Sequence, residues 1–271
     1  MKLACQEHLI PGATLIEKWE WIASVGFDGI ELHGHGEFKF RERLPELRQA
    51  QRAGVVMPSV CVIMDHFIGD FDPEKRRDAI NNMKSLLSVI AEIGGQGAIT
   101  PAAFGLFSRA LPPFKPPRSP EDDREVLIEG LRELGEHAAR EGVFVLLEPL
   151  NRYEDHMLHT LQAAGDLCAA VGLAAVKVMG DFFHMSIEEQ DLAAAIGQAG
   201  QYVTHMHLAD SNRLQPGMGH TDFGPALVAL KQIGFSGYMA LECGIRGERK
   251  AALAETSRYI RSLLTEIVIE Q

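Results

Sequence analysis

The sequence predicts a single (β/α)8 TIM barrel, of the α/β class, as one domain spanning residues 1–271. Short apolar runs alternate with amphipathic segments along the whole chain, which is the pattern of parallel strands joined by helices. The alternation occurs eight times within roughly 250 residues, the usual size of a closed barrel. An open doubly wound sheet is the alternative, but no GxGxxG follows the first strand, so the usual dinucleotide fingerprint is absent.

The predicted strands are short enough to be buried barrel strands. In chain order they are KLACQE (2–7), DGIELHG (28–34), VVMPSVCVI (55–63), QGAIT (96–100), VFVLLE (143–148), VKVMGD (176–181), VTHMHLAD (203–210) and GYMALEC (237–243). The segments between them carry apolar residues at helical spacing. They are 14–26, 41–54, 72–95, 121–142, 160–172, 186–200, 223–234 and roughly 248–268.

Local signals support several helix boundaries. Thr14 and Glu17 have the spacing of a capping box, and Gly26 is a stop signal. Ser119 and Pro120 are suited to the cap and first position of the next long helix. Before them, residues 104–120 form a long loop with five prolines between 112 and 120. Loops of this length in compact domains are often lids, so we expect a proline-rich lid over the barrel mouth.

Composition excludes some classes of function. The formal net charge of −11 argues against a nucleic-acid partner, because phosphate binding requires a basic face. The four cysteines lie far apart in apolar runs, as free thiols in a reducing compartment do. The N-terminus does not resemble a signal peptide, and no stretch is apolar enough to span a membrane. We therefore expect a cytoplasmic protein without a membrane partner.

Four consecutive predicted strands end in residues that can bind a metal. Strand C-termini face the active site in a (β/α)8 barrel, so Glu148, Asp181, His207 and Glu242 should converge. Each acid alone is typical of a solvated loop. His205 shares the face of His207, so one of the two could be a hydrogen-bonded structural histidine. Three carboxylates and one imidazole indicate a divalent cation. Mn²⁺ is favoured, with Mg²⁺, Co²⁺ or Zn²⁺ as alternatives.

Three motifs carry a family resemblance. EPLNRYE (148–154), DFFHMSIEE (181–189) and HMHLADSNRLQPGMGH (205–220) resemble the xylose isomerase-like barrel superfamily of sugar isomerases and epimerases. Within it they are most similar to the ketose 3-epimerases acting on D-tagatose, D-psicose or L-ribulose. The resemblance is good over roughly residues 140 to 245. In the N-terminal half the resemblance is limited to the alternation of strands and helices that barrels share.

The resemblance implies roles for individual residues. By position, Glu148, Asp181, His207 and Glu242 would hold the metal, and Glu148 and Glu242 would transfer protons. Glu154, His184 and Arg213 would bind the sugar substrate. It also implies a homo-oligomer, either a dimer or a tetramer.

The expected reaction is epimerisation of a free ketose at C3. Two carboxylates on opposite sides of the carbon can remove its proton and return one to the other face, through a cis-enediolate stabilised by the metal. An aldose–ketose or hydroxypyruvate-type isomerase, or an epimerase or dehydratase of a phosphorylated sugar, would use the same groups. The segment GMGHTDF (217–223) and Phe182 depart from the ketohexose epimerase pattern, which leaves the substrate open.

The sequence also offers further candidate residues and two alternative classes of protein. Glu31 and His33, at the end of the second predicted strand, and His8, after the first, are candidates for substrate contact at the mouth. His220 is a weaker candidate for a phosphate group. A DNA-repair nuclease on the same barrel would need a histidine-rich cluster and a basic surface. A non-catalytic metal- or sugar-binding protein is the third class considered.

Overall fold

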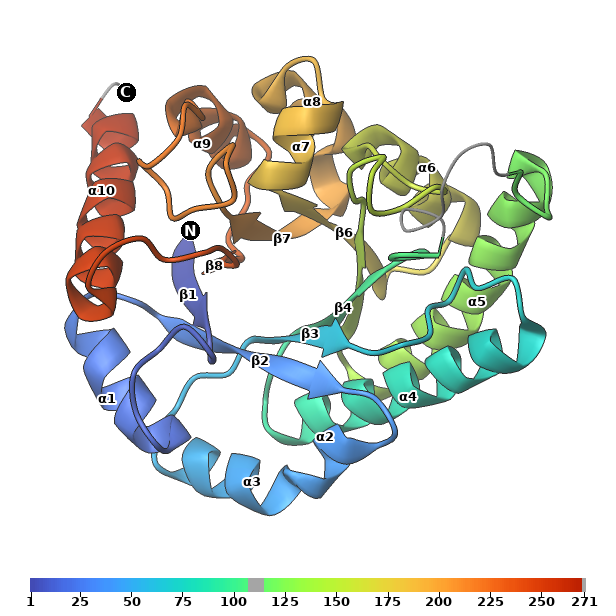
Figure 1. Cartoon of the computed structure of the whole chain (residues 1–271), viewed down its shortest axis with the longest axis horizontal. Coiled ribbons are helices and arrows are strands. Elements are labelled where there is room, and N and C mark those ends of the chain that lie inside the picture. The colour runs from blue at the N-terminus through green and yellow to red at the C-terminus, as the bar shows by residue number, and fades with distance from the viewer. Residues whose placement is uncertain (107–114, 270–271) are drawn as a thin grey trace.

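Parallel strands close into a barrel with helices around it (Figure 1). The structure, a computed structural model, describes residues 1–106 and 115–269, without the side chains of 268 and 269. Its strands are β1 (Lys2–Gln6), β2 (Gly29–His35), β3 (Ser59–Ile63), β4 (Gly97–Pro101), β5 (Phe144–Glu148), β6 (Val176–Asp181), β7 (Val203–Leu208) and β8 (Tyr238–Leu241). Each pairs in parallel with the next, and β8 pairs with β1. The predicted (β/α)8 barrel is confirmed.

The helices lie outside the barrel, where all but α10, which follows the last strand, connect consecutive strands. They are α1 (Leu15–Ser24), α2 (Lys39–Glu42), α3 (Leu44–Arg52), α4 (Pro73–Glu92), α5 (Pro120–Glu141), α6 (Leu161–Val171), α7 (Phe182–Glu188), α8 (Leu192–Ala199), the short 3₁₀ helix η1 (Gly200–Tyr202), α9 (Phe223–Gln232) and α10 (Arg249–Ile269). Of the predicted lid at 104–120, residues 107–114 lie outside the described residues.

Two helix predictions were wrong in their boundaries. The helix expected at 41–54 is divided at Arg43 into α2 and α3. The helix expected from 186 begins earlier, at Phe182, because the side chain of Asp181 accepts a hydrogen bond from the Phe183 N–H and caps α7. That helix ends at Glu188, and Asp191 caps a separate helix, α8.

The predicted caps at Thr14 and Ser119 are present. Thr14 Oγ1 accepts from the Glu17 N–H, but Glu17 accepts from the N–H of Ala13 and not of Thr14, so the expected reciprocal box is displaced by one residue. At α5 the box is complete, because Ser119 and Asp122 each accept from the other's backbone N–H. Both caps satisfy backbone donors that a helix start leaves free.

The two-residue period of the strands determines which side chains enter the barrel. A small interior layer consists of Cys61, Ile99, Leu146 and Met179, while a much larger apolar cluster lies between the strands and the helices. Successive side chains of a strand point to opposite faces. Glu148 therefore faces the interior two residues beyond Leu146, and Asp181 does so two residues beyond Met179.

The C-terminal helix α10 is tied to the beginning of the chain. The guanidinium of Arg261 donates to the carbonyl oxygen of Gly26 and to the carboxylate of Asp28, both at 2.7 Å. In Figure 1, α10 accordingly lies next to α1 and completes the ring of helices. Within the described ranges, we find no helix with the length and apolar character needed to cross a lipid bilayer.

Candidate active site

The structure brings together the four strand-end residues that the sequence singled out. Glu148, Asp181, His207 and Glu242 each offer a ligand-type atom, and these atoms lie within 4.8 Å of one another. The Nδ1 atom of His207 is 3.3 Å from Glu242 Oε2, 3.5 Å from Glu148 Oε1 and 3.8 Å from Asp181 Oδ2. The cluster lies at the C-terminal ends of strands β5 to β8, where barrel enzymes have their active sites.

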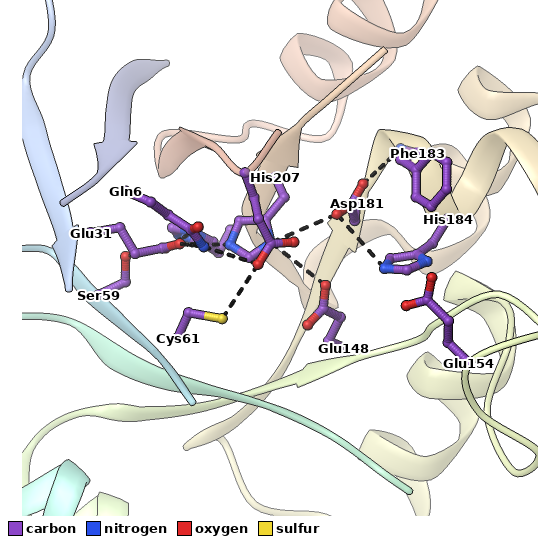
Figure 2. Close-up of polar contacts among 12 residues, drawn as sticks. Gln6, Glu31, Ser59, Cys61, Glu148, Glu154, Asp181, Phe183, His184 and His207 are labelled. Carbon is purple, nitrogen blue, oxygen red and sulfur yellow. Dashed lines mark hydrogen bonds and ion pairs between the residues drawn. The ribbon is translucent and has the colours of Figure 1, made fainter. Parts of the chain in front are cut away.

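Several atoms of this cluster are buried without a hydrogen-bond partner among the described residues. They are Glu148 Oε1, Asp181 Oδ2 and His207 Nδ1. Buried polar atoms are normally paired, and those that are not require an explanation such as an ion. The two carboxylate oxygens of Asp181 have different environments. Oδ1 caps α7, while Oδ2 points to the cluster (Figure 2). The atoms without partners are those that a cation would bind.

The electrostatics of the cluster are unfavourable without a cation. Burial raises the pKa of Asp181 well above its usual range, and the nearby charge of Glu242 adds to the shift. Burial also raises the pKa of Glu148. Burial opposes ionisation of Glu242 too, but His207 and Arg213 outweigh it and hold the pKa of that carboxyl below its ordinary value. When all three are ionised, the buried Glu148 and Asp181 and the partly buried Glu242 place excess negative charge around one imidazole, which a dication would neutralise.

Glu31 lies behind His207 and not at the mouth, where the sequence had suggested it. Its side chain is fully buried, and its Oε1 is 2.7 Å from His207 Nε2. In Figure 2, Gln6, Glu31 and Ser59 are on one side of His207, and Asp181, Glu148 and His184 are on the other. The suggestion of direct substrate contact by Glu31 was therefore wrong, since its carboxylate is used in contacts beneath the cluster.

The residues expected to bind substrate line a cavity next to the cluster. It has a volume of about 160 Å³ and reaches Glu148, Glu154, His184, Arg213 and Glu242. The other lining residues carry no charge and are mostly apolar: Cys61, Val62, Ile63, Phe67, Pro101, Phe104 and Leu150. An apolar lining with a few polar groups is the usual composition of a small-molecule site.

His184 is held by a residue that the sequence analysis did not select. Asn151 approaches His184 Nδ1 with its side-chain nitrogen at 2.7 Å and its backbone N–H at 3.3 Å. Burial lowers the pKa of His184 to about 3, and the charge of Arg213 adds to the effect. The ring is therefore neutral, and its Nε2 faces the site 3.9 Å from Asp181 Oδ2.

Arg213 joins the substrate-binding residues to the cluster. Its guanidinium is 3.2 Å from Glu242 Oε2 and 3.5 Å from Glu154 Oε1, and it stacks over the ring of Phe183 at 4.7 Å. The backbone of Arg213 has a φ of 58°, a left-handed conformation that is uncommon for residues other than glycine. Its backbone is fixed there by hydrogen bonds to Asp210 O and from the Gly244 N–H, each 2.8 Å.

The loop that carries Arg213 is organised around Asp210, which the sequence analysis also missed. The buried carboxylate of Asp210 accepts from the backbone N–H groups of Ser211, Gly217 and Thr221. The signal in the sequence is an acid two residues after β7, followed by a loop with Gly217 and Gly219, which is a common turn-forming pattern.

The three remaining candidate histidines do not line this cavity. The rings of His8 and His33 are 4.5 Å apart, and His33 Nε2 is 3.3 Å from Gln6 Oε1. His220 is exposed in the loop after β7. None of these three histidines is among the residues lining the cavity next to the cluster.

The sequence of the chain matches a known protein family and several known enzymes. The sequence model described as "Xylose isomerase-like TIM barrel" matches residues 19–263. The chain is 38% identical to the 3-dehydro-D-guloside 4-epimerase of Escherichia coli K12 over 97% of its length and 100% of the relative. It is 32% identical to the D-psicose 3-epimerase of Enterocloster bolteae over 82% of its length and 74% of the relative.

A solved structure agrees with these sequence matches. The crystal structure of a 3-keto-D-glucoside 4-epimerase from E. coli in its apo form has a TM-score of 0.89 and 36% identity. The superposition covers 97% of this chain and 99% of the other. The similarity to this structure thus extends through the N-terminal half, where the sequence had shown only the alternation of strands and helices that barrels share.

Proposed function

The chain belongs to the xylose isomerase-like TIM barrel family, and we propose that it is a divalent-metal-dependent sugar epimerase that inverts a carbinol carbon next to a ketone. Two relatives that match 97% and 82% of the chain are sugar epimerases. The observation that supports the proposal most directly is the convergence of three buried atoms that have no hydrogen-bond partner in the described part of the chain, Glu148 Oε1, Asp181 Oδ2 and His207 Nδ1.

The donor set suits a divalent cation. Glu148, Asp181, His207 and Glu242 would hold it, and three carboxylates with one imidazole are typical ligands of Mn²⁺, Mg²⁺, Co²⁺ or Zn²⁺ in open sites. We favour Mn²⁺, because the set combines several hard oxygens with one nitrogen. When bound, such an ion polarises a carbonyl oxygen and so acidifies the neighbouring C–H bond.

Glu148 and Glu242 are the proposed proton-transfer residues. They come from β5 and from the end of β8, and they have oxygens within 4.8 Å of one another. A sugar carbon between them would present one face to each carboxylate. One glutamate would remove the proton and the other would donate a proton to the opposite face, through an enediolate, and the roles would exchange in the reverse reaction.

The polar residues that line the cavity would orient the sugar. Arg213 is positioned to donate to a hydroxyl or to a developing oxyanion, and neutral His184 presents Nε2 toward the same space. Glu154, 3.5 Å from Arg213, would accept from a sugar hydroxyl. Phe67 and Phe104, with ring centroids 5.8 Å apart, would exclude water from the other side of the substrate.

Two substrate classes fit this chemistry. A 3-keto sugar glycoside, inverted at C4, is our first candidate, because a relative that matches 97% of the chain is a 3-dehydro-D-guloside 4-epimerase. A free ketose inverted at C3, as expected from the motifs, is the second, since a D-psicose 3-epimerase also matches most of the chain. Both reactions move a proton on a carbon next to a ketone, so the same residues serve either.

The decisive experiment follows hydrogen exchange by NMR. Purified protein with Mn²⁺ in D₂O is offered a methyl 3-keto-glycoside and, separately, D-tagatose, D-fructose and L-ribulose. Deuterium at C4 of the glycoside with a new epimer supports the first candidate, and deuterium at C3 of a ketose supports the second. Exchange at C1 indicates an aldose–ketose isomerase. Loss of a hydroxyl indicates a dehydratase, and no exchange on any substrate contradicts epimerisation of these unphosphorylated sugars.

The assembly is a separate part of the proposal. We expect a dimer or a tetramer, as the family resemblance implies, and light scattering on the purified protein measures it.

A further inference from the structure

Glu31 has polar contacts on both carboxylate oxygens although it is fully buried. Oε1 lies 2.7 Å from His207 Nε2 and 3.1 Å from Gln6 Nε2. Oε2 accepts from Ser59 Oγ at 2.6 Å and lies 2.8 Å from His205 Nε2. No lysine or arginine is among these contacts, so Glu31 is not half of an ordinary ion pair.

The contact with His207 decides which ring nitrogen faces the cluster. A neutral imidazole has one N–H donor and one acceptor nitrogen. Because Glu31 can only accept while ionised, it fixes the proton of His207 on Nε2. Nδ1 then presents a lone pair toward Glu148, Asp181 and Glu242.

Gln6 extends this support to a second residue of the cluster. Its Nε2 donates to Glu31 Oε1 at 3.1 Å and to Glu242 Oε1 at 3.0 Å. Both of these partners are carboxylates, which only accept while ionised, so they fix the direction of the amide and leave Gln6 Oε1 3.3 Å from His33 Nε2. Glu242 comes directly after β8, and it is held from beneath by a residue of β1, the neighbouring strand.

We infer that Glu31 is a positioning residue that sets the tautomer and orientation of His207 for metal binding, and that Gln6 links it to Glu242. Residues that hydrogen-bond the far nitrogen of a ligand histidine commonly change metal affinity by about 10–100-fold when they are removed. The inference rests on the proposed function, because it assumes that the cluster of four binds a cation.

The test measures metal binding directly. Full-length wild-type protein and Glu31→Gln are stripped with a chelator and titrated with Mn²⁺ by calorimetry and with Co²⁺ by visible absorption. The amide keeps the size of the glutamate but can present its NH₂ group to His207 Nε2. We expect one ion per wild-type chain, a loss of about 10–100-fold in Mn²⁺ affinity for the variant, and a changed Co²⁺ spectrum.

Glu7→Gln is the matched control. Glu7 is also a buried glutamate at the end of β1, but its carboxylate binds Arg43 and the His33 N–H, not the cluster. Its substitution should leave the Mn²⁺ affinity and the Co²⁺ spectrum unchanged. If Glu7→Gln lowers the affinity as much as Glu31→Gln does, a general loss of stability explains both and the inference is wrong.

Ser59→Ala provides a second route if Glu31→Gln does not fold. It removes one donor to Glu31 and leaves the contact with His207 in place, so we expect a smaller loss of affinity in the same direction. Unchanged affinity and spectrum in a folded Glu31→Gln, or in Ser59→Ala if only that variant folds, would overturn the inference alone. A wild-type chain that binds neither ion would overturn the proposed function as well.

Discussion

The side-chain nitrogen of Asn151 lies 2.7 Å from Nδ1 of His184. The Asn151 backbone N–H approaches the same atom, so Nδ1 is the acceptor and the proton of the neutral ring is on Nε2. The residue that follows EPL in the chain therefore determines what His184 presents to the cavity. A substrate oxygen there would meet a donor.

Removing the Asn151 side chain should weaken catalysis without affecting the metal. Asn151→Ala takes away the closer of the two donors to Nδ1, and an unmade buried hydrogen bond costs about 1–3 kcal/mol. Since 1.4 kcal/mol corresponds to a factor of ten, we expect kcat/KM to fall roughly tenfold or more. The measurement is steady-state epimerisation together with Mn²⁺ affinity. A normal kcat/KM in the variant would show that the His184 tautomer does not matter.

The two proposed proton-transfer residues should fail in different ways. Glu148→Gln and Glu242→Gln should each lower the rate of epimerisation by about 10²–10⁴-fold. If each glutamate serves one face, each variant should still exchange solvent deuterium into one epimer without inverting it, and the two variants should choose opposite epimers. NMR in D₂O resolves both signals. Exchange of the same epimer by both variants would contradict the assignment of faces.

The fold was readable because its signals are local. Apolar runs such as VFVLL and the caps at Thr14 and Ser119 depend on neighbours within a few residues. The helix boundary at Phe182 was missed because a second role of Asp181 produced it. Its carboxylate was read only as a metal ligand, although one oxygen also caps α7.

The sequence predicted the four clustered residues of the site but not the residues that hold them in place. Glu148, Asp181, His207 and Glu242 stand out because each ends an apolar strand, and barrel topology makes strand ends converge. Glu31 is the third residue of the seven-residue strand β2, and the stagger of barrel strands places it beneath His207. That offset depends on pairing between distant segments, and the same is true of the contact between Asn151 and His184.

Metal should stabilise the protein, and more so as the pH rises. Burial raises the pKa of Asp181 and Glu148 in the metal-free protein. Their ionisation therefore costs stability as pH rises from the unfolded pKa values near 4 toward the higher folded ones. A bound dication favours the ionised carboxylates and so removes this loss of stability. At Mn²⁺ 100-fold above Kd we expect about 2.7 kcal/mol of stabilisation.

Thermal unfolding with EDTA or Mn²⁺ between pH 5.5 and 8 measures this effect. Asp181→Asn is the informative variant, since it should lose most of the response to Mn²⁺ while remaining folded. A metal response that is equal in Asp181→Asn and wild type would show that the ion binds elsewhere.

Arg213 should not be replaceable by lysine. Its guanidinium contacts Glu154 and Glu242 at once and stacks on Phe183, which a single ammonium cannot reproduce. We expect Arg213→Lys to lower kcat/KM by about tenfold or more, equivalent to roughly 1.4 kcal/mol, with little change in Tm. Arg152→Lys is the control, because Arg152 pairs with Glu188 outside the cavity. Equal losses in both variants would mean that Arg213 has no special role.

The ion pair between Glu7 and Arg43 should make stability depend on pH in a predictable direction. Two oxygens of Glu7 accept from Arg43 at 2.7 and 2.8 Å. Burial alone would raise the pKa of Glu7, but the bonds from Arg43 outweigh it and lower the pKa. A carboxyl with a lowered folded pKa contributes its stabilisation above the unfolded value, near 4.3, and loses it as pH falls through the folded value.

Glu7→Gln should therefore be less stable than wild type at pH 7, by about 2 kcal/mol, and the difference should shrink as the pH falls toward 3. Urea unfolding across this range measures both effects. Glu46→Gln is the control on the same arginine, because Glu46 is half-exposed and contacts Arg43 at 3.2 Å, so it should cost at most about 0.5 kcal/mol. A deficit of Glu7→Gln that stays constant with pH would indicate lost packing and not a lost charge.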